Sequence, residues 1–441
     1  MILSKRLLLL VAAFGTFFTI SFPAFAQDSL KLDFGKFNLQ DLNMKFWASD
    51  SAAPAAVLGE VGELDMYDGD SYDGYSLKVH RRIKIFTKEG FDQANVVIPY
   101  QTKEGLQTVE NIKAHTITPQ GNIIPVEKST IVTESIDKDI SAKKIIFPEI
   151  TEGCIIEYSY VLDSRGGLYQ LTEWSFQDNI PTRLSSLFVN FLNKYSYVWL
   201  RNGKENIKTI EGKKEGTNRP GPYEFTSNSH YKYTFYARDL PAIKNEPFVT
   251  SQKNHLTRIR FQLSYYMQNT GYVQKVLTTW DKLAEDFIEN DYFGREFLRK
   301  SKYDDVWKAA QSVIDSTDSA RAKVLKLYKW VGENFEIDET FSLFRAISPN
   351  ETFKKRRGNE NNLNLLLIAL LKEAGLDAHP MLLSTRKHGT HFMDYPISAQ
   401  FNRAVTYVEF SPQDAIILDA GNKIYPWAYL QKKRSTARVG S

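Results

Sequence analysis

The residues whose types and spacing could do chemistry most directly lie in one glycine-containing stretch near the C-terminal end of the chain. His388, His391 and Asp394 offer three possible metal ligands, and Ser384 with His388 offers a hydroxyl nucleophile and a base. Histidines three residues apart in a loop are poor metal geometry, and nothing in the sequence fixes the orientation of Ser384. We therefore interpret this stretch as an exposed loop between two strands, and we predict no metal and no cofactor.

A thiol is the other nucleophile to consider, and the chain has one, Cys154. It alternates with Ile156 and Tyr158, a pattern typical of a strand with one buried face. We predict a buried thiol rather than a reactive one. A single cysteine also excludes an intrachain disulfide, so stability must come from the apolar core, for which 42% hydrophobic residues suffice.

Glu360 stands at the start of the most regular part of the stretch FKKRRGNENNLNLLLIALLKEAGLDAHPMLLSTR, residues 353–386. After Gly358-Asn359 come fifteen residues without Gly or Pro and with a leucine-rich centre, which predicts a buried helix. Asn359 is suited to cap the N-terminus of this helix, and Gly375 fits the left-handed position at its end. The helix dipole favours a carboxylate in the first turn by about 0.3–1 kcal/mol, so Glu360 also has an ordinary structural role.

A Gly-Asn turn that opens a Leu-rich helix and is followed by EAGLDAHPMLLSTR resembles the catalytic helix of the transglutaminase-like superfamily, the papain-like cysteine hydrolases and acyltransferases. The stretch is most similar to that of secreted bacterial members in which such a domain follows an N-terminal β-sandwich of unknown function. Residues 400–405 look like the strand that carries the family's histidine, and residues 417–420 look like the strand that carries its aspartate. The resemblance covers residues 280–427 well and the preceding β-rich region more loosely.

The resemblance implies a site whose catalytic residues have been replaced. The family's chemistry uses a thiol activated at a helix N-terminus, a histidine that exchanges its proton and a carboxylate that orients the imidazole. Here Glu360 occupies the thiol position and Arg403 the histidine position, and only Asp419 is retained. The family holds these positions within hydrogen-bond reach, so we hypothesise a Glu360–Arg403 ion pair. The candidate ligand-binding residues of the groove are then Asn359, Glu360, Asn402 and Arg403.

Residues 1–26 have the pattern of a cleavable secretory signal. Lys5 and Arg6 precede an apolar run over residues 7–20, and small residues precede the expected cleavage after Ala26. No later stretch has the length of apolar sequence that a membrane span requires. We therefore expect an exported protein, periplasmic or extracellular, without a membrane span.

The next residues are expected to form a lead-in and linker, 27–59, and then an antiparallel β-sandwich, 60–260. Short alternating segments recur there between turn signals. Asp68, Asp70 and Asp73 faintly suggest a calcium loop, but the glutamate of an EF-hand is missing from its position. A hairpin turn is the better interpretation.

Helical periodicity replaces the β pattern in the last domain, residues 265–441. Amphipathic segments at 280–289, 306–315 and 319–334 precede the Leu-rich helix, and apolar strands follow it. We therefore expect a multidomain chain, in which the antiparallel β-sandwich precedes an α+β transglutaminase-like, papain-like domain. After Asp419 the sequence departs from the family's usual continuation, which leaves open a domain truncated at its C-terminus.

The formal net charge of +4 comes without a clustered basic face and gives no case for nucleic acid. We expect a catalytically inactive transglutaminase-like protein that binds or scaffolds a peptide, protein or glycan of the cell envelope, because loss of the thiol or the base alone removes nearly all acyl-transfer rate. One alternative is an active, protease-like hydrolase or acyltransferase with a site that uses no cysteine, such as Glu360 in acid–base catalysis. A carboxylate beside an arginine is ionised and poorly basic, which counts against it. Another alternative is a purely structural role for the helix.

Overall fold

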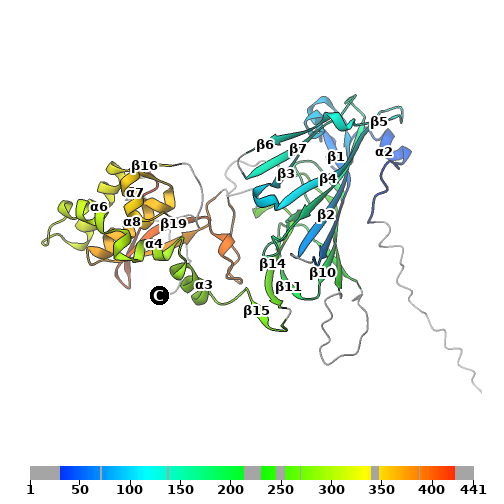
Figure 1. The fold of residues 1–441 in the computed structure, drawn as a ribbon. Helices are drawn as coiled ribbons and strands as arrows, with labels where there is room; N and C mark the ends of the chain where they lie inside the picture. Colours follow the sequence, from blue (N-terminus) through cyan, green and yellow to red (C-terminus); the bar gives the residue numbers. More distant parts are fainter. Residues whose placement is uncertain are drawn as a thin grey trace, which may run out of the picture.

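The structure is a computed structural model that describes residues 30–69, 72–136, 139–212, 230–244, 254–268, 270–338, 347–386 and 388–422. The predicted signal sequence and Asp70 of the suggested calcium loop lie outside these ranges. Figure 1 shows a β-rich domain built from the first part of the chain beside a mixed domain built from its C-terminal part. Within the described ranges, no helix has both the length and the apolar character that crossing a membrane requires.

The β-rich domain is built on one large sheet with the strand order β12-β13-β10-β1-β2-β8-β4-β5. Its strands β1 and β2 form an antiparallel hairpin, so the hairpin interpretation of the acidic segment is confirmed. Asp68 and Asp73 lie in the turn, and their carboxylates are 3.0 and 2.7 Å from Lys194 Nζ. The strands of this sheet are β1 (Ala55–Tyr67), β2 (Gly74–Ile85), β4 (Gln107–Ile117), β5 (Ile123–Pro125), β8 (Ile155–Ser164), β10 (Thr182–Leu192), β12 (Lys208–Glu211) and β13 (His230–Leu240).

Strand β1 differs from the expectation in two ways. It begins at Ala55, so residues 55–59, which we expected to be part of a linker, pair in the sheet. Small residues such as Ala55 and Ala56 suggested a loop, but both are fully buried because β1 lies in the middle of the sheet. β1 also pairs in parallel with β10, whereas we expected an antiparallel sandwich. Several strands separate β1 from β10 in the chain, and a parallel pair needs such a long connection.

Two smaller sheets complete the β-rich domain. β14 pairs with β9, β11 and β15, and β7 pairs with β3 and β6. One apolar core contains side chains from all three sheets, and the rings of Phe235 and Phe261 lie 5.6 Å apart in it. Cys154 belongs to this core and is fully buried, as predicted. The strands are β3 (Asn95–Gln101), β6 (Ile131–Ser135), β7 (Ile140–Ile146), β9 (Trp174–Ser175), β11 (Tyr195–Asn202), β14 (Arg258–Met267) and β15 (Val273–Lys275).

The N-terminal segment that contains α2 (Leu39–Asn43) packs on the large sheet through a second, smaller apolar cluster. Polar contacts hold this segment at both ends. The Leu30 carbonyl accepts a hydrogen bond from Ser186 Oγ at 2.7 Å, and the Asp41 carboxylate accepts two from Arg183, at 2.6 and 2.8 Å. Residues that we expected to be a lead-in are thus an integral layer of the β-rich domain.

A fully buried carboxylate, Glu157, lies beneath the same segment. Its Oε1 accepts a hydrogen bond from Arg82 Nε at 3.0 Å and lies 2.8 Å from His80 Nε2. Its Oε2 lies 2.7 Å from His115 Nε2 and accepts a hydrogen bond from the Gly35 N–H at 2.9 Å. Although burial raises the pKa of Glu157, the hydrogen bonds from His115 and His80 and the charge of Arg82 hold it well below its usual range. This carboxylate ties three strands to the N-terminal segment.

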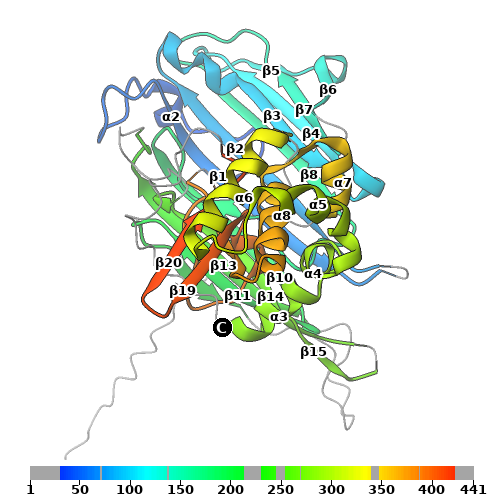
Figure 2. The same cartoon turned by 90° about the vertical axis from the view of Figure 1, so that its left-hand side faces the viewer.

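The C-terminal domain combines helices with a three-stranded sheet of order β18-β19-β20. α8 packs against β18 and β19 and also contacts α6 and α7. Figure 2 shows this domain in front of the β-rich one, with α6 and α8 in the foreground and β19 and β20 in red at one side. The elements are α3 (Trp280–Glu289), α4 (Gly294–Leu298), α5 (Asp304–Ala310), α6 (Ala320–Asn334), β16 (Glu336–Ile337), α7 (Pro349–Lys355), β17 (Arg357–Gly358), α8 (Glu360–Glu373), β18 (Asp377–Leu383), the 3-10 turn η7 (Ser398–Gln400), β19 (Arg403–Ser411) and β20 (Asp414–Leu418).

Helix α8 is the Leu-rich helix that the sequence predicts. Asn359 Oδ1 accepts a hydrogen bond from the Asn362 N–H at 2.9 Å, which confirms the predicted cap, and Gly375 has a φ of +80° at the predicted left-handed position. Every residue from Asn361 to Leu371 is buried, which explains why the leucines do not form a single apolar face. The short helices α4 and α7 were not predicted from the sequence.

Candidate functional site

Three elements bring together the residues that the family resemblance singled out. Glu360 begins α8, Arg403 begins β19, and Asp419 directly follows β20. Arg403 Nη1 lies 2.7 Å from Glu360 Oε2, and Arg403 Nη2 lies 2.6 Å from Asp419 Oδ2. The hypothesised Glu360–Arg403 ion pair is therefore present, and Asp419 joins it as a second carboxylate. We refer to these three residues as the ion triad.

The ion triad is largely shielded from solvent. The side chains of Arg403, Asp419 and Glu360 are 13%, 16% and 32% exposed. Arg403 Nη2 is close to Asp419 without hydrogen-bond geometry, and Arg403 Nε has no hydrogen-bond partner among the residues that the structure describes. The guanidinium therefore acts on the two carboxylates mainly through its charge, in surroundings where charges interact more strongly than in water. One cation between two anions leaves a formal excess of one negative charge.

A buried asparagine on α8 holds the retained aspartate in place. Asn364 is fully buried, and its Nδ2 donates to Asp419 Oδ1 at 3.0 Å and to the Glu360 carbonyl at 2.9 Å. Its Oδ1 accepts a hydrogen bond from the Ala420 N–H at 2.9 Å. One helix turn earlier, Asn361 Oδ1 accepts a hydrogen bond from the Ala404 N–H at 2.8 Å. The two amides thus fix the backbone next to Arg403 and next to Asp419 relative to the start of α8.

The segment that follows Asp419 passes very close to the first residue of α8. A Cβ atom on Gly421 would lie only 2.5 Å from Glu360 Cα, so a glycine is required at this approach. The Gly421 N–H donates to Asp419 Oδ1 at 3.2 Å, and the Tyr328 hydroxyl donates to the Asp419 carbonyl, also at 3.2 Å. Asp419 is therefore positioned by both its side chain and its backbone.

Two further residues that we proposed for ligand binding make local contacts. Asn359 is the N-cap of α8 and is 7% exposed. Asn402 accepts a hydrogen bond from the Thr385 N–H at 2.8 Å and donates one to Thr385 Oγ1 at 2.9 Å, which closes the loop between β18 and β19 at its base. Both side chains have structural roles, and their contact with a ligand stays a prediction.

The loop between β18 and β19 contains the histidines considered for metal and nucleophilic chemistry. Ser384 Oγ lies 3.0 Å from His388 Nδ1, but the hydroxyl also donates a hydrogen bond to the Gly389 carbonyl. A serine has one proton to donate, so this contact takes the proton that a base would have to remove. His391 Nε2 lies 3.0 Å from Met393 Sδ. The described residues contain no group of three or more His, Cys, Asp or Glu side chains that could hold a metal ion.

The thiol lies in the other domain. Cys154 immediately precedes β8 in the core of the β-rich domain, and burial raises the pKa of this thiol above its ordinary value. A buried, protonated thiol is a poor nucleophile. The positions of the ion triad therefore contain no sulfur, and the only cysteine cannot substitute for one.

Comparison with known families agrees with this geometry. Residues 308–415, which contain α8, β19 and the first two residues of β20, match a family model described as the transglutaminase-like superfamily. The chain contains a transglutaminase-like domain. Residues 74–244 match a second model, described as a domain of unknown function, DUF3857. The transglutaminase-like domain thus follows a β-rich domain of unknown function, as the sequence resemblance implied.

One solved structure supports the fold of this chain at low identity. A crystal structure of a "putative protease" from Parabacteroides distasonis is similar over 83% of this chain and 67% of that one, with 13% identity and a TM-score of 0.58. A "putative cysteine protease" from Cytophaga hutchinsonii aligns over 81% of this chain and 78% of that one, with 14% identity and a TM-score of 0.20, too low to support any inference. No curated protein matches the chain significantly.

The sequence pointed to the ion triad but not to the asparagines that support it. Neither Asn361 nor Asn364 was predicted to have a role. The signal was present in ENNLN, where polar amides interrupt a helix that is otherwise apolar. A buried amide must find hydrogen-bond partners, so such an interruption indicates a polar contact across the core.

Proposed function

We propose that the transglutaminase-like domain no longer transfers acyl groups and serves as a binding or scaffolding module of an exported protein, with a peptide or glycan of the cell envelope as its ligand. The observation that carries the proposal is the ion triad. Arg403 lies between Glu360 and Asp419, at the positions where the family has its base, its nucleophile and its orienting carboxylate.

The chemistry of these groups supports the loss of acyl transfer. Glu360 offers no thiol, and its Oε2 is engaged by Arg403 Nη1 at 2.7 Å, so the nucleophile that the family uses is missing. An arginine keeps its proton at all physiological pH values, so Arg403 cannot act as the acid and base that a histidine would be. Two of the three roles therefore have no occupant, and loss of either one is enough to remove nearly all of the rate.

The contacts around the ion triad support a structural role for these residues, in which the domain keeps its fold without its reaction. Two buried asparagines and a close-approaching glycine surround the former reaction centre, and these contacts fix the relative positions of α8, β19 and β20. Two cavities of the described residues, one beside Tyr169 and one beside Arg321, are lined by neither Glu360 nor Arg403. We infer that the ion triad stabilises the domain, while ligand contacts are made elsewhere on its surface.

The test is an activity assay on purified mature protein and on the double variant Glu360→Cys, Arg403→His. Wild type is expected to be silent in acyl-transfer and peptidase assays, and the double variant is expected to gain an activity that iodoacetamide abolishes. The matched control is Glu360→Cys alone, which has the thiol but no base and should stay silent. Activity in wild type that is lost in Glu360→Gln would contradict the proposal and indicate an enzyme that uses a carboxylate.

A serine nucleophile is the alternative that the Ser384 hydroxyl allows, and it has a control of its own. If wild type were active and Glu360→Gln were active too, Ser384→Ala would show whether the Ser384–His388 contact supplies the nucleophile. Export is tested separately, by fractionating cells that express the full chain with a C-terminal epitope. Retention of the uncleaved chain in the cytoplasm would contradict that part of the proposal.

A further inference from the structure

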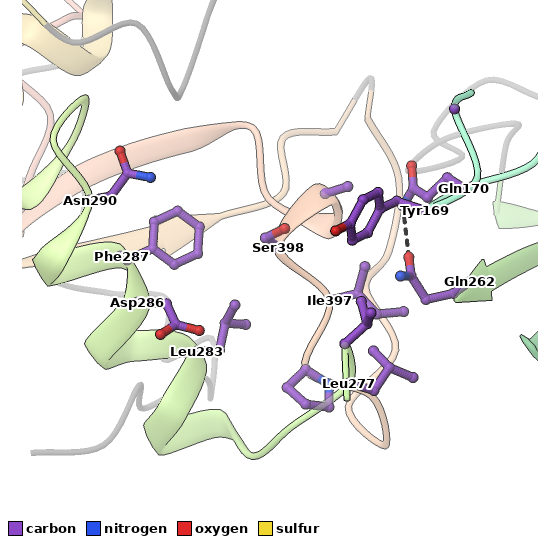
Figure 3. Close-up of a pocket in the computed structure, with 14 residues that line it drawn as sticks. Tyr169, Gln170, Gln262, Leu277, Leu283, Asp286, Phe287, Asn290, Ile397 and Ser398 are labelled. Carbon is purple, nitrogen blue, oxygen red and sulfur yellow. Dashed lines mark hydrogen bonds between the residues drawn. The ribbon is translucent and has the colours of Figure 1, made fainter. Parts of the chain in front are cut away.

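A cavity of about 560 Å³ lies between the two domains, away from the ion triad. Its volume is in the range of small-molecule sites, about 300–1,000 Å³. Figure 3 shows Tyr169, Gln170 and Gln262 of the β-rich domain on one side, α3 residues on the other, and Ile397 and Ser398 between them. The lining residues are Gly167, Tyr169, Gln170, Gln262, Val276, Leu277, Leu283, Asp286, Phe287, Asn290, Pro396, Ile397, Ser398 and Ala399.

The wall from the β-rich domain presents an aromatic ring on a fixed backbone. The Tyr169 carbonyl accepts a hydrogen bond from the Leu263 N–H at 3.0 Å, which attaches this residue to β14. Tyr169 is nevertheless 60% exposed to solvent. Beside it, Gln170 Nε2 donates to Gln262 Oε1 at 3.1 Å. Because the backbone under this ring is already held, a ligand that stacks on the ring has only the side-chain torsions to order.

The wall from α3 combines an apolar floor with polar groups. Phe287 is buried, whereas Asn290 is partly exposed and its Oδ1 accepts a hydrogen bond from the Tyr292 N–H at 2.8 Å. Asp286 is the one charged residue among the described residues that line the cavity, and its Oδ1 lies 3.0 Å from Lys282 Nζ. The cavity therefore offers neither an unpaired charge for an ionic ligand nor a basic side chain for an anionic one.

The segment between the two walls is held by its own side chains. Gln400 Nε2 donates to the Tyr395 carbonyl at 2.8 Å and to the Phe392 carbonyl at 3.3 Å. The indole N–H of Trp280 donates to the Met393 carbonyl at 3.1 Å, and the Thr390 N–H donates to Asn254 Oδ1 at 2.6 Å. The loop between β18 and β19 is thus attached both to α3 and to the β-rich domain, and the cavity is formed without a ligand.

Several polar groups of the cavity have no partner within the described part of the chain. They are Gln170 Oε1, Asn290 Nδ2 and Ser398 Oγ. Together they provide acceptors and donors at separate points around an exposed ring. Sugars match this arrangement, because their hydroxyls both donate and accept hydrogen bonds while their C–H faces pack on aromatic rings. We propose that the interdomain cavity is a binding site for a neutral oligosaccharide.

This site is separate from the ion triad, so the inference goes beyond the proposed function and does not depend on whether acyl transfer has been lost. It involves both domains, since Tyr169 and Gln262 come from one and Asn290 and Ser398 from the other. Binding is therefore expected to stabilise the two domains in the arrangement of Figure 1.

Isothermal titration calorimetry of the full mature chain tests the proposal with uncharged hexasaccharides as probes: β-1,4-linked glucose, xylose and N-acetylglucosamine, and α-1,4-linked glucose. At least one is expected to bind with a dissociation constant in the micromolar to millimolar range. Tyr169→Ala and Asn290→Ala should each weaken this binding by about tenfold or more. The matched control is Tyr272→Ala, because Tyr272 is similarly exposed, at 63%, but does not line the cavity.

Two outcomes would overturn the proposal: no binding of any neutral probe at millimolar concentration, or equal loss of binding in the Tyr272 and Tyr169 variants. Binding of hexagalacturonate or of a basic hexapeptide alone would overturn the ligand class. The Glu360→Cys, Arg403→His variant separates this site from the proposed function, since it should bind the oligosaccharide as wild type does. Thiol activity gained by the double variant tests the proposed function alone. Loss of sugar binding in the double variant would overturn the cavity as the sugar site and place the sugar at the ion triad.

Discussion

Replacing Arg403 by methionine tests whether the ion triad stabilises the C-terminal domain. Methionine keeps an apolar stem of similar length and removes the charge that Glu360 and Asp419 share. Removal of one partner of a buried ion pair costs about 3–5 kcal/mol, because the other charge stays buried without compensation. Since Glu360 is 32% exposed and partly solvated, we expect the lower end of that range, a loss of about 3 kcal/mol of unfolding free energy at pH 7.

Hydrogen exchange of the α8 amides, measured by mass spectrometry, reports the unfolding free energy of this domain without interference from the β-rich one. Arg321→Met is the matched control, because Arg321 pairs with Asp414 where both side chains are about half exposed, at 50% and 46%. An exposed pair of this kind contributes at most about 1 kcal/mol. The reasoning is refuted if Arg403→Met loses no more unfolding free energy than Arg321→Met.

Two more substitutions test the buried polar contacts. Asn364→Leu leaves the Ala420 N–H without a partner and leaves Asp419 Oδ1 with the Gly421 N–H alone. A buried unsatisfied group costs about 1–3 kcal/mol, so exchange of the α8 amides should accelerate, and rates equal to wild type would contradict this. Glu157→Gln tests the β-rich domain: because the folded-state pKa of Glu157 is depressed, its stabilising contribution is present above pH 4.5 and is lost as the pH falls below that value. Urea titrations at pH 7 and pH 3.5 should show a drop in unfolding free energy that is larger for wild type than for the variant. The variant starts from a lower stability at pH 7, and equal drops would refute the assignment.

The sequence predicted best where the signals are local. Asn359 and Gly375 mark the two ends of α8 by their own conformational preferences, and the leucines between them leave little choice but a buried helix. The boundaries of α3 and α6 followed from amphipathic spacing, and in the structure Thr279 and Ser319 cap these two helices. The Glu360–Arg403 pair was within reach because the family resemblance supplied the spatial proximity that spacing alone does not.

Prediction failed where structure depends on distant partners. Ala55 and Ala56 suggested a loop, and only the position of β1 between β2 and β10 makes small residues suitable there. Asn364 has a partner 55 residues away, so its role was not visible in the helix sequence. The residues that line the interdomain cavity are spread between positions 167 and 399, so no local sequence pattern indicates such a site.

The parallel pairing of β1 with β10 has a consequence for how the protein is made. β1 ends at residue 67 and β10 ends at residue 192, so 125 further residues (192 − 67) must be synthesised before this edge of β1 can be paired. At about 5–20 residues per second, that takes roughly 6–25 s. The Leu30–Ser186 and Asp41–Arg183 contacts, which span 156 and 142 residues, have to wait as long. During that interval the unpaired edge of β1 can pair with another chain, so aggregation through this strand is a risk until β10 has been made.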